Sequence, residues 1–375
     1  MNSIRPSIDI GQSAPVDSAS QYLNGAFQKP NTSAPTQEIY GASLSHDLNN
    51  RPSTSLFASQ PWIEALTATY GFDIKASTSL AANGNRSAIL YSEISDIRGQ
   101  RIISLPFSDY CDPLVDTQTD WQRLIAPILK LQKPVRFKTV FNDIPLGDER
   151  FSKHVCALWH GVDLTRSEDD LMAHLKDTAR RNIRKARKHG VTIRQSSSID
   201  DMRTFYGLHC HVRKTKYRLL AQPPSFFENL YTSFAPGSNL VIQLAELDGI
   251  AIAGILFLIH GDTIYYKFNA SKDLECRPND LLAWEGMLYG KRRGLARLDF
   301  GLSDLEQPGL IKFKRKFATE ERGITQLQWA PLNYVDPYTR ATGEVLNRLT
   351  RILTEQEVPD SISRATSDLL YRYFC

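Results

Sequence analysis

The run from Leu240 to Phe300 constrains the fold most, because it reads as three strands, a helix and a fourth strand. Leu240–Leu247 and Ile250–Ile259 are apolar runs joined by Asp248-Gly249. This pair suits the positive φ angles of a type I′ hairpin turn. Thr263–Asn269 reads as the third strand of the same meander.

A helix and a strand follow the meander. Asn279 suits the N-cap, and Gly294 suits the C-terminal end after a run of three basic residues. Leu295–Phe300 then alternates as a short strand does. The resulting β-β-β-α-β order predicts an α/β fold, and the basic segment Gly309–Phe317 is expected to form a helix after the last strand.

Composition bounds the class of protein. The chain has 375 residues, enough for two domains, and a net charge of +4, so any anion binding must come from local clusters. No apolar run reaches the roughly 18 residues that a membrane span needs, and the N-terminus lacks the apolar core of a signal peptide. The five cysteines are dispersed, which favours free thiols and a cytoplasmic location.

Four segments are predicted. Residues 1–55 are rich in Ser, Asn, Gln, Pro and Ala and are expected to be a disordered tail. Residues 56–164 alternate strands and helices as a first α/β domain, and residues 165–335 form the second. Residues 336–375 are expected to be a helical tail that packs back on the first domain.

The densest basic cluster is Arg180–His189, where six cations fall within nine residues. An apolar stripe at helical spacing predicts one helix from about Leu171 to Gly190, started by a capping box at Thr165 or at Ser167. The cations lie on faces of this helix away from the stripe. Guanidinium groups bind phosphate oxygens in pairs, which favours phosphate or nucleic-acid contact. A solvated basic face that stabilises the helix dipole is the equally weighted alternative.

Two other patterns are rejected. His209-Cys210-His211 resembles metal ligands, but adjacent helical residues point apart and no second cluster completes a site, so no metal is expected. Lys291–Ala296 resembles the R/Q-x-x-G-x-A loop of CoA-dependent acetyltransferases, with Lys in the first position, yet it lies at the C-terminal end of the predicted helix. There, carbonyls rather than phosphate-binding N–H groups are exposed.

Taken together, five motifs in this order resemble the FemAB-type transferases, GNAT-like proteins typified by peptidoglycan bridge formation. The motifs are Ser104–Tyr110, Arg181–Gly190, Pro278–Glu285, Leu298–Gly301 and Gly309–Phe317. The resemblance spans about residues 56–332. It implies two tandem GNAT-like domains, with the active site in or beside the second, and aminoacyl transfer from tRNA to an amine of a cell-wall precursor.

The resemblance also implies the site. Lys314, Asp109 and Phe313 are expected to be catalytic; the family's Phe-Lys pair falls on Phe313-Lys314, where an ammonium would stabilise oxyanion charge. Lys316 is expected to be more peripheral. The expected substrate-binding residues are Tyr110, Arg181, Lys185, Tyr266, Asn269, Trp284, Asp299 and Lys312.

The sequence leaves the donor open. The leading hypothesis is an N-acyl or aminoacyl transferase acting on an envelope glycan or a phosphate-bearing precursor, which would bring the enzyme to the inner face of the membrane. It needs no cofactor beyond aminoacyl-tRNA or acyl-CoA as co-substrate. The alternative is an acyl-CoA-dependent N-acyltransferase of polysaccharide or exopolysaccharide biosynthesis. A non-catalytic nucleic-acid module is disfavoured by the mild charge and few nearby aromatics, and DNA is not expected as a partner.

Overall fold

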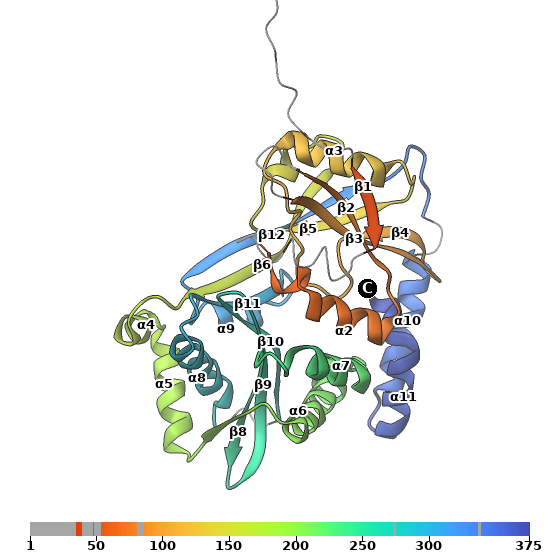
Figure 1. Cartoon of the computed structure of the whole chain (residues 1–375). Coiled ribbons are helices and arrows are strands. Elements are labelled where there is room, and N and C mark those ends of the chain that lie inside the picture. Colours follow the sequence, from red (N-terminus) through yellow and green to blue (C-terminus); the bar gives the residue numbers. More distant parts are fainter. Residues whose placement is uncertain (1–34, 40–47, 49–53, 81–85, 273–274, 337–338) are drawn as a thin grey trace, which may run out of the picture. The chain divides into compact units, whose positions relative to one another are not determined.

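In the computed structural model, one mixed sheet contains all the strands of the described part of the chain (Figure 1). The structure describes residues 35–39, 48, 54–80, 86–272, 275–336 and 339–375. Most of the predicted tail lies outside these residues; within it, Thr36–Ile39 forms an edge strand paired antiparallel with the next strand. No helix in the described part of the chain is both long and apolar enough to span a membrane.

The strands are β1 (Thr36–Ile39), β2 (Ile74–Leu80), β3 (Arg86–Asp96), β4 (Gly99–Ile103), β5 (Val135–Thr139), β6 (Ser152–Asp163), β7 (Thr192–Ser196), β8 (Leu240–Leu247), β9 (Ile250–His260), β10 (Thr263–Ser271), β11 (Arg297–Asp304) and β12 (Glu320–Trp329). The α-helices are α2 (Gln60–Tyr70), α3 (Gln118–Leu129), α4 (Glu168–His174), α5 (Asp177–Lys188), α6 (Ile199–Val212), α7 (Pro224–Phe234), α8 (Pro278–Arg292), α9 (Pro308–Lys314), α10 (Thr339–Leu353) and α11 (Asp360–Leu370). Short helical turns are η1 (Leu56–Ala58), η2 (Ile144–Gly147), the π-helical η3 (Arg213–Tyr217) and η4 (Tyr371–Phe374).

The sheet contains two similar halves, which we call the first half (β1–β5 with α3) and the second half (β7–β11 with α8). In each half a meander ends in a strand that pairs parallel with the strand beyond a crossover helix: β4 with β5 across α3, and β10 with β11 across α8. This repetition and the β-β-β-α-β order agree with the tandem GNAT-like fold predicted from the sequence.

The two halves exchange their last strands. The sheet order is β1-β2-β3-β4-β5-β12-β6-β11-β10-β9-β8-β7. Thus β6, which follows the first half in the chain, pairs with β11, and β12, which follows the second half, pairs with β5. The exchanged strands also pair with each other. The halves are therefore joined through backbone hydrogen bonds rather than through side chains alone.

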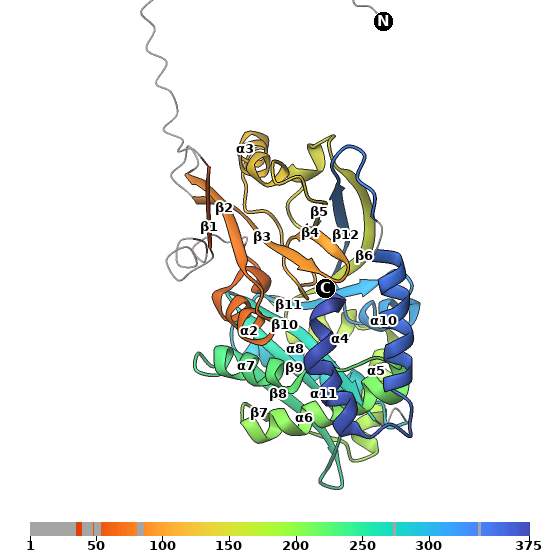
Figure 2. The same ribbon diagram turned by 90° about the vertical axis from the view of Figure 1, so that its right-hand side faces the viewer.

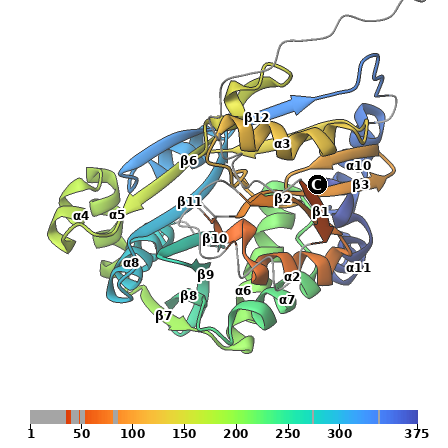
Figure 3. The same cartoon turned by 45° about the horizontal axis from the view of Figure 1, so that its top comes forward.

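Helices cover both faces of the second half. In Figure 1, α5 and α8 lie on one side of β8–β10, and α6 and α7 lie on the other. In the first half, α3 packs against β2 and β3 (Figure 3). The C-terminal helices α10 and α11 stand side by side (Figure 2), and Tyr371 after them stacks its ring on Tyr70 and contacts Phe107.

Several local predictions hold. Asp248 and Gly249 both have positive φ, as a type I′ turn requires. α6 continues directly into the π-helical turn η3. The basic segment after β11 is helical from Pro308 to Lys314, although Phe317 lies beyond its end.

Two local predictions are wrong. The single helix expected from Leu171 to Gly190 is two helices, because Arg180 donates to the last carbonyls of α4 and stabilises a break. Ser167 caps α4 by accepting from the N–H of Asp170, so this capping box prevails over the one at Thr165. At α8, Asn279 is inside the helix, and the N-cap position is Arg277 in a left-handed conformation.

Candidate active site

The candidate site lies where β11 leaves β10. These parallel strands pair over only three residues, the last rung joining Tyr265 to Asp299. On its other side, β11 changes register against β6 between Asp299 and Leu302. Gly301, at φ +67, provides the left-handed residue that this bulge requires. The bulge turns the carbonyl groups of residues 301 and 302 away from the regular ladder.

Lys314 fills the space behind this bulge. Its side-chain Nζ donates to the carbonyl oxygens of Gly301 at 3.0 Å and of Leu302 at 2.7 Å. The residue is only 3% exposed, and burial lowers the pKa of its ammonium to about 8, although Asp109 and Asp299 oppose the shift. An ammonium has three N–H donors, so one remains beyond those that the two carbonyls accept.

Asp109 reaches the same bulge from the first half. It lies on the loop between β4 and α3, and its Oδ2 accepts from the backbone N–H of Leu302 at 3.2 Å. A Cβ added at Gly301 would come within 2.4 Å of that oxygen, so the glycine is needed for the approach. Asp109 and Lys314 come from distant segments, and the fold brings both to the bulge. Their catalytic roles stay predictions.

Lys267 is the third member of the cluster and was not among the residues predicted from the sequence. Its Nζ donates to Oδ1 of Asp109 at 2.8 Å, and its side chain is 7% exposed. The ammonium lies over the rings of Phe57 at 4.6 Å and Trp62 at 4.9 Å. The signal available in the sequence was a lysine between Tyr266 and Phe268 in an otherwise largely apolar strand.

The neighbours of Asp109 keep its carboxyl group ionised. Burial alone would raise the pKa of Asp109, but Lys267, the N–H of Leu302 and Lys314 outweigh it and hold the pKa below its usual range. Asp109 is therefore a carboxylate flanked by two buried ammonium groups. We define the Asp109 cluster as Asp109, Lys267 and Lys314.

Asp299 and Tyr110 stand behind the cluster. The Tyr110 hydroxyl donates to Oδ2 of Asp299 at 2.7 Å, and the N–H of Gly301 donates to Oδ1 at 2.5 Å. Both side chains are 2% exposed. Burial raises the pKa of Asp299, and nearby Asp109 adds to the shift. The two predicted substrate-binding residues therefore support the bulge, since their polar atoms already bind each other.

The other predicted residues divide into two groups. Tyr266 and Asn269 are half-buried. Tyr266 packs its ring on Phe300 at 5.2 Å between centroids, and Asn269 donates to the side chain of Asn279 at 3.2 Å. Arg181, Lys185 and Lys312 are exposed on the outer faces of α5 and α9.

The prediction that Trp284 binds substrate is wrong. It is 1% exposed within the core between α8 and the sheet, because α8 is apolar nearly all round and is buried on most sides. No substrate can reach its ring in this structure. Phe313, predicted to be catalytic, packs its ring on Phe317 at 5.4 Å between centroids, with the ammonium of Lys316 over it at 4.6 Å.

Lys316 is also placed differently from the prediction. Its ammonium forms an ion pair with Asp280, a buried residue in the first turn of α8. Asn182 of α5 donates to the other oxygen of Asp280 at 3.1 Å. Lys316 thus connects the end of α9 to α8 and α5, and it is not a peripheral cation.

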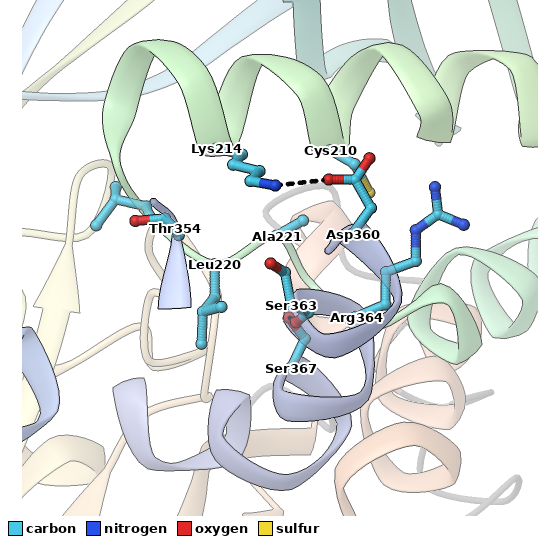
Figure 4. Close-up of a pocket in the computed structure, with 10 residues that line it drawn as sticks. Cys210, Lys214, Leu220, Ala221, Thr354, Asp360, Ser363, Arg364 and Ser367 are labelled. Atoms are coloured by element: carbon cyan, nitrogen blue, oxygen red, sulfur yellow. Dashed lines mark hydrogen bonds and ion pairs between the residues drawn. The ribbon is translucent and has the colours of Figure 1, made fainter. Parts of the chain in front are cut away.

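A separate pocket lies between the end of α6 and α11 (Figure 4). Lys214 and Asp360 form an ion pair of 2.8 Å beside it. It shares no lining residue with the Asp109 cluster. Among the residues that the structure describes, no group of His, Cys, Asp and Glu side chains is arranged to hold a metal ion.

Comparisons with known proteins show which domain family and which solved structures this chain resembles. Residues 173–315 match the family of acetyltransferase (GNAT) domains, which confirms the prediction of an acyltransferase. The crystal structure of FemX aligns with a TM-score of 0.61 at 15% identity, covering 83% of this chain and 100% of that chain. The C-terminal domain (DUF2156) of a putative lysylphosphatidylglycerol synthetase from Agrobacterium fabrum aligns with a TM-score of 0.52 at 14% identity, covering 78% and 92%.

No curated protein matches the sequence. At these identities the two structural likenesses show the fold alone, while the sequence match covers residues 173–315, which include Lys267 and Lys314. Residues 173–315 therefore match a GNAT acetyltransferase domain, and the chain has a GNAT-like fold that it shares with FemX.

Proposed function

We propose that the protein transfers an aminoacyl or acyl group to an amine of a cell-envelope glycan or of its phosphate-bearing precursor. The observation that carries this proposal is the Asp109 cluster at the β11 bulge, where a carboxylate and two buried ammonium groups meet. A substrate in the cell envelope is supported by the fold that the chain shares with FemX and with the domain of a putative lysylphosphatidylglycerol synthetase.

The chemistry requires an amine to attack an ester or thioester carbonyl. A C–N bond forms, the C–O or C–S bond to the carrier breaks, the amine loses a proton, and the leaving oxygen or sulfur gains one. Charge develops on the carbonyl oxygen in between. The remaining N–H of Lys314 supplies a donor for that charge, since its pKa of about 8 leaves the ammonium form predominant at pH 7.

Asp109 has a different role in this proposal. Since its carboxylate is held ionised, it can accept a hydrogen bond from the neutral amine of the acceptor and orient the nitrogen lone pair toward the carbonyl carbon. A quarter of its side chain is exposed, so an acceptor can reach it. Lys267, whose ammonium already donates to Asp109 and lies over two aromatic rings, fixes the carboxylate in this proposal.

An acetyltransferase domain implies an acyl-CoA donor, and the described residues fit its pyrophosphate poorly. In the second half, the helix N-terminus that could present backbone N–H groups to a phosphate is the first turn of α8. Pro278 has no N–H there, and the carboxylate of Asp280 occupies that turn. A pyrophosphate would have to displace Asp280 from Lys316 and Asn182. These contacts favour an aminoacyl ester as donor over acyl-CoA.

The test offers both donors to the purified protein with a panel of envelope amines. Transfer of a labelled amino acid from aminoacyl-tRNA to an amine, abolished in Asp109→Asn, is the expected result. Release of thiol from acyl-CoA that also depends on Asp109 would show that acyl-CoA is the donor and would leave the proposed acyl transfer to an amine in place. Transfer from either donor that persists unchanged in Asp109→Asn would contradict the assignment of the site.

A further inference from the structure

The guanidinium of Arg297 lies over two aromatic rings and makes no hydrogen bond or ion pair with any residue that the structure describes. Its Cζ is 5.7 Å from the ring centroid of Phe141 and 5.9 Å from that of Trp159. Arg297 is exposed, Phe141 is half-buried and Trp159 is buried. Cation–π contacts of this kind hold a guanidinium in place and leave its N–H donors available to a ligand.

The sheet fixes the two rings. Trp159 folds over Gly161 of the same strand, where an added Cβ would meet the indole at 2.2 Å. Phe141 packs edge-to-face on this indole, 4.9 Å between centroids. A second guanidinium, that of Arg322 on β12, lies 5.1 Å from the centroid of the Phe141 ring. We call Arg297, Phe141 and Trp159 the Arg297 corner.

The Arg297 corner adjoins the residues that stand behind the Asp109 cluster. Arg297 and Asp299 are two residues apart on β11 before its bulge, so their side chains leave the same face of the sheet. Phe141 contacts the ring of Tyr110, 5.6 Å between centroids, and the Tyr110 hydroxyl donates to Asp299. Since Tyr110 directly follows Asp109 in the chain, an anion bound to Arg297 would lie beside the candidate site.

The neighbouring charges indicate a singly charged anion. Arg322 is already paired with Glu320 at 2.6 Å. Asp163 stands opposite Arg297 in the ladder and has Arg166 at 3.6 Å. Of these three guanidinium groups, only that of Arg297 lacks a carboxylate partner among the described residues.

This arrangement favours a carboxylate over a phosphate. A carboxylate fits a single guanidinium through two parallel N–H···O bonds. A phosphate monoester carries about −1.5 to −2 charges at pH 7, so the carboxylates of Glu320 and Asp163 would repel it more strongly. The reacting carboxyl group of an aminoacyl donor is esterified and uncharged, which assigns a free carboxylate to the acceptor.

We infer that Arg297 binds a carboxylate of the acceptor, so that the protein selects amines of amino acids or of other molecules that carry a carboxylate near the amine. The inference rests on the proposed function and names the acceptor class within it. The Arg297 corner holds one end of the acceptor while Asp109 orients the amine at the other. Because this contact lies away from the reacting atoms, its loss is expected to raise KM and to leave kcat unchanged.

The experiment compares variants that lose the same charge and the same kind of ring contact. Arg297→Gln removes the guanidinium of the Arg297 corner. Arg293→Gln is the matched control, because Arg293 is exposed and its Cζ lies 5.9 Å from the ring centroid of Tyr289. Arg297→Lys keeps the charge but loses the geometry for two parallel bonds.

The probes are straight-chain ω-amino carboxylates of increasing length, their carboxamides, and ω-aminoalkyl phosphates of matched length. Calorimetric titration without a donor measures their binding, so this readout does not depend on activity. The parent is expected to bind the carboxylates more tightly than the carboxamides. Arg297→Gln should lose ~10-fold in affinity for the carboxylates alone, Arg297→Lys should retain part of the preference, and Arg293→Gln should retain all of it.

Two results would overturn the inference. Equal affinity for carboxylates and carboxamides in the parent, or a preference that Arg297→Gln retains in full, would make Arg297 a stacked surface cation. A preference for the phosphates that depends on Arg297 would contradict the assignment of a carboxylate.

A further variant separates this inference from the proposed function. Asp109→Asn should abolish transfer and keep the preference for carboxylates in binding. In transfer assays, KM for the amino carboxylates should rise ~10-fold in Arg297→Gln at unchanged kcat. Absence of transfer from both donors would contradict the proposed function alone. Transfer that is equally efficient to carboxylates and to carboxamides would overturn the role of Arg297 and leave the proposed function in place.

Discussion

The ammonium of Lys267 lies 2.8 Å from Oδ1 of Asp109, under cover of the rings of Phe57 and Trp62. The lysine comes from β10 in the second half, and the aspartate and both rings come from residues before α3. This one ion pair therefore fixes the first half against the second at the point where β11 bulges.

Replacing Lys267 by Met is expected to raise the pKa of Asp109, because burial is then opposed by fewer positive charges. The acid limb of kcat/KM should move to higher pH. At pH 7, kcat/KM should fall ~10-fold to 100-fold, the range of a hydrogen bond to a charged group. A pH–rate profile measures both effects. Lys267→Arg keeps the charge and should restore part of the activity; an unmoved acid limb in Lys267→Met would contradict the role.

The same pair predicts how stability depends on pH. The pKa of Asp109 is lower in the folded than in the unfolded state, so its contribution is present above the unfolded pKa and is lost as pH falls through the folded pKa. Unfolding by urea between pH 3 and pH 6 is expected to show a shallower loss of stability in Lys267→Met than in the parent. Parallel curves for the two proteins would refute this coupling.

Lys314→Met retains much of the side-chain volume and removes the charge. Turnover should fall ~10²–10³-fold with little change in substrate binding, as for loss of an oxyanion donor. In the parent, turnover should also decline as pH rises through about 8, where Lys314 loses its proton. Lys130→Met is the control, since Lys130 is exposed after α3, whereas Lys316 is unsuitable because it pairs with Asp280. Full turnover in a folded Lys314→Met would exclude Lys314 from catalysis.

Gly301→Ala tests the close approach at the bulge. Alanine at φ +67 is strained, and its Cβ would meet Oδ2 of Asp109 at 2.4 Å. Gly294→Ala is the matched control, since Gly294 has φ +71 and nothing within 4 Å of an added Cβ. Both variants should lose ~1–3 kcal/mol in unfolding free energy from the strained backbone. Only Gly301→Ala should also lose activity; equal activity in both would show that Asp109 tolerates displacement.

Tyr110→Phe removes the hydroxyl that donates to Asp299. Unfolding free energy should fall by ~1–3 kcal/mol, because a buried acceptor loses its partner. The pKa of Asp299 is already raised in the fold, so its favourable contribution is present at low pH and lost as pH rises through the folded pKa. Without the hydroxyl that loss should extend to higher pH. Tyr289→Phe, whose hydroxyl accepts from Arg293 near the surface, should change stability by under ~0.5 kcal/mol.

Much of the fold follows from local patterns. The Asp248-Gly249 turn, the meander around it and the helix before β11 are visible in the sequence, because strand alternation and turn chemistry depend on neighbouring residues. The same reasoning failed where a side chain makes a contact that the local pattern does not show. The break between α4 and α5 depends on Arg180 reaching back to α4, which periodicity does not report.

The site was determined by the sequence only in part. The motifs identified Asp109 and Lys314 through resemblance, but Lys267 lies 158 residues from Asp109 along the chain. Only the tertiary structure places them in contact, because the exchange of β6 and β12 joins the halves and sets their register. The resemblance marked Trp284 as a candidate equally well, yet burial of α8 on most sides assigns it to the core. Sequence patterns record which faces are apolar; which distant faces meet depends on long-range strand pairing, and that decides which polar residues share a site.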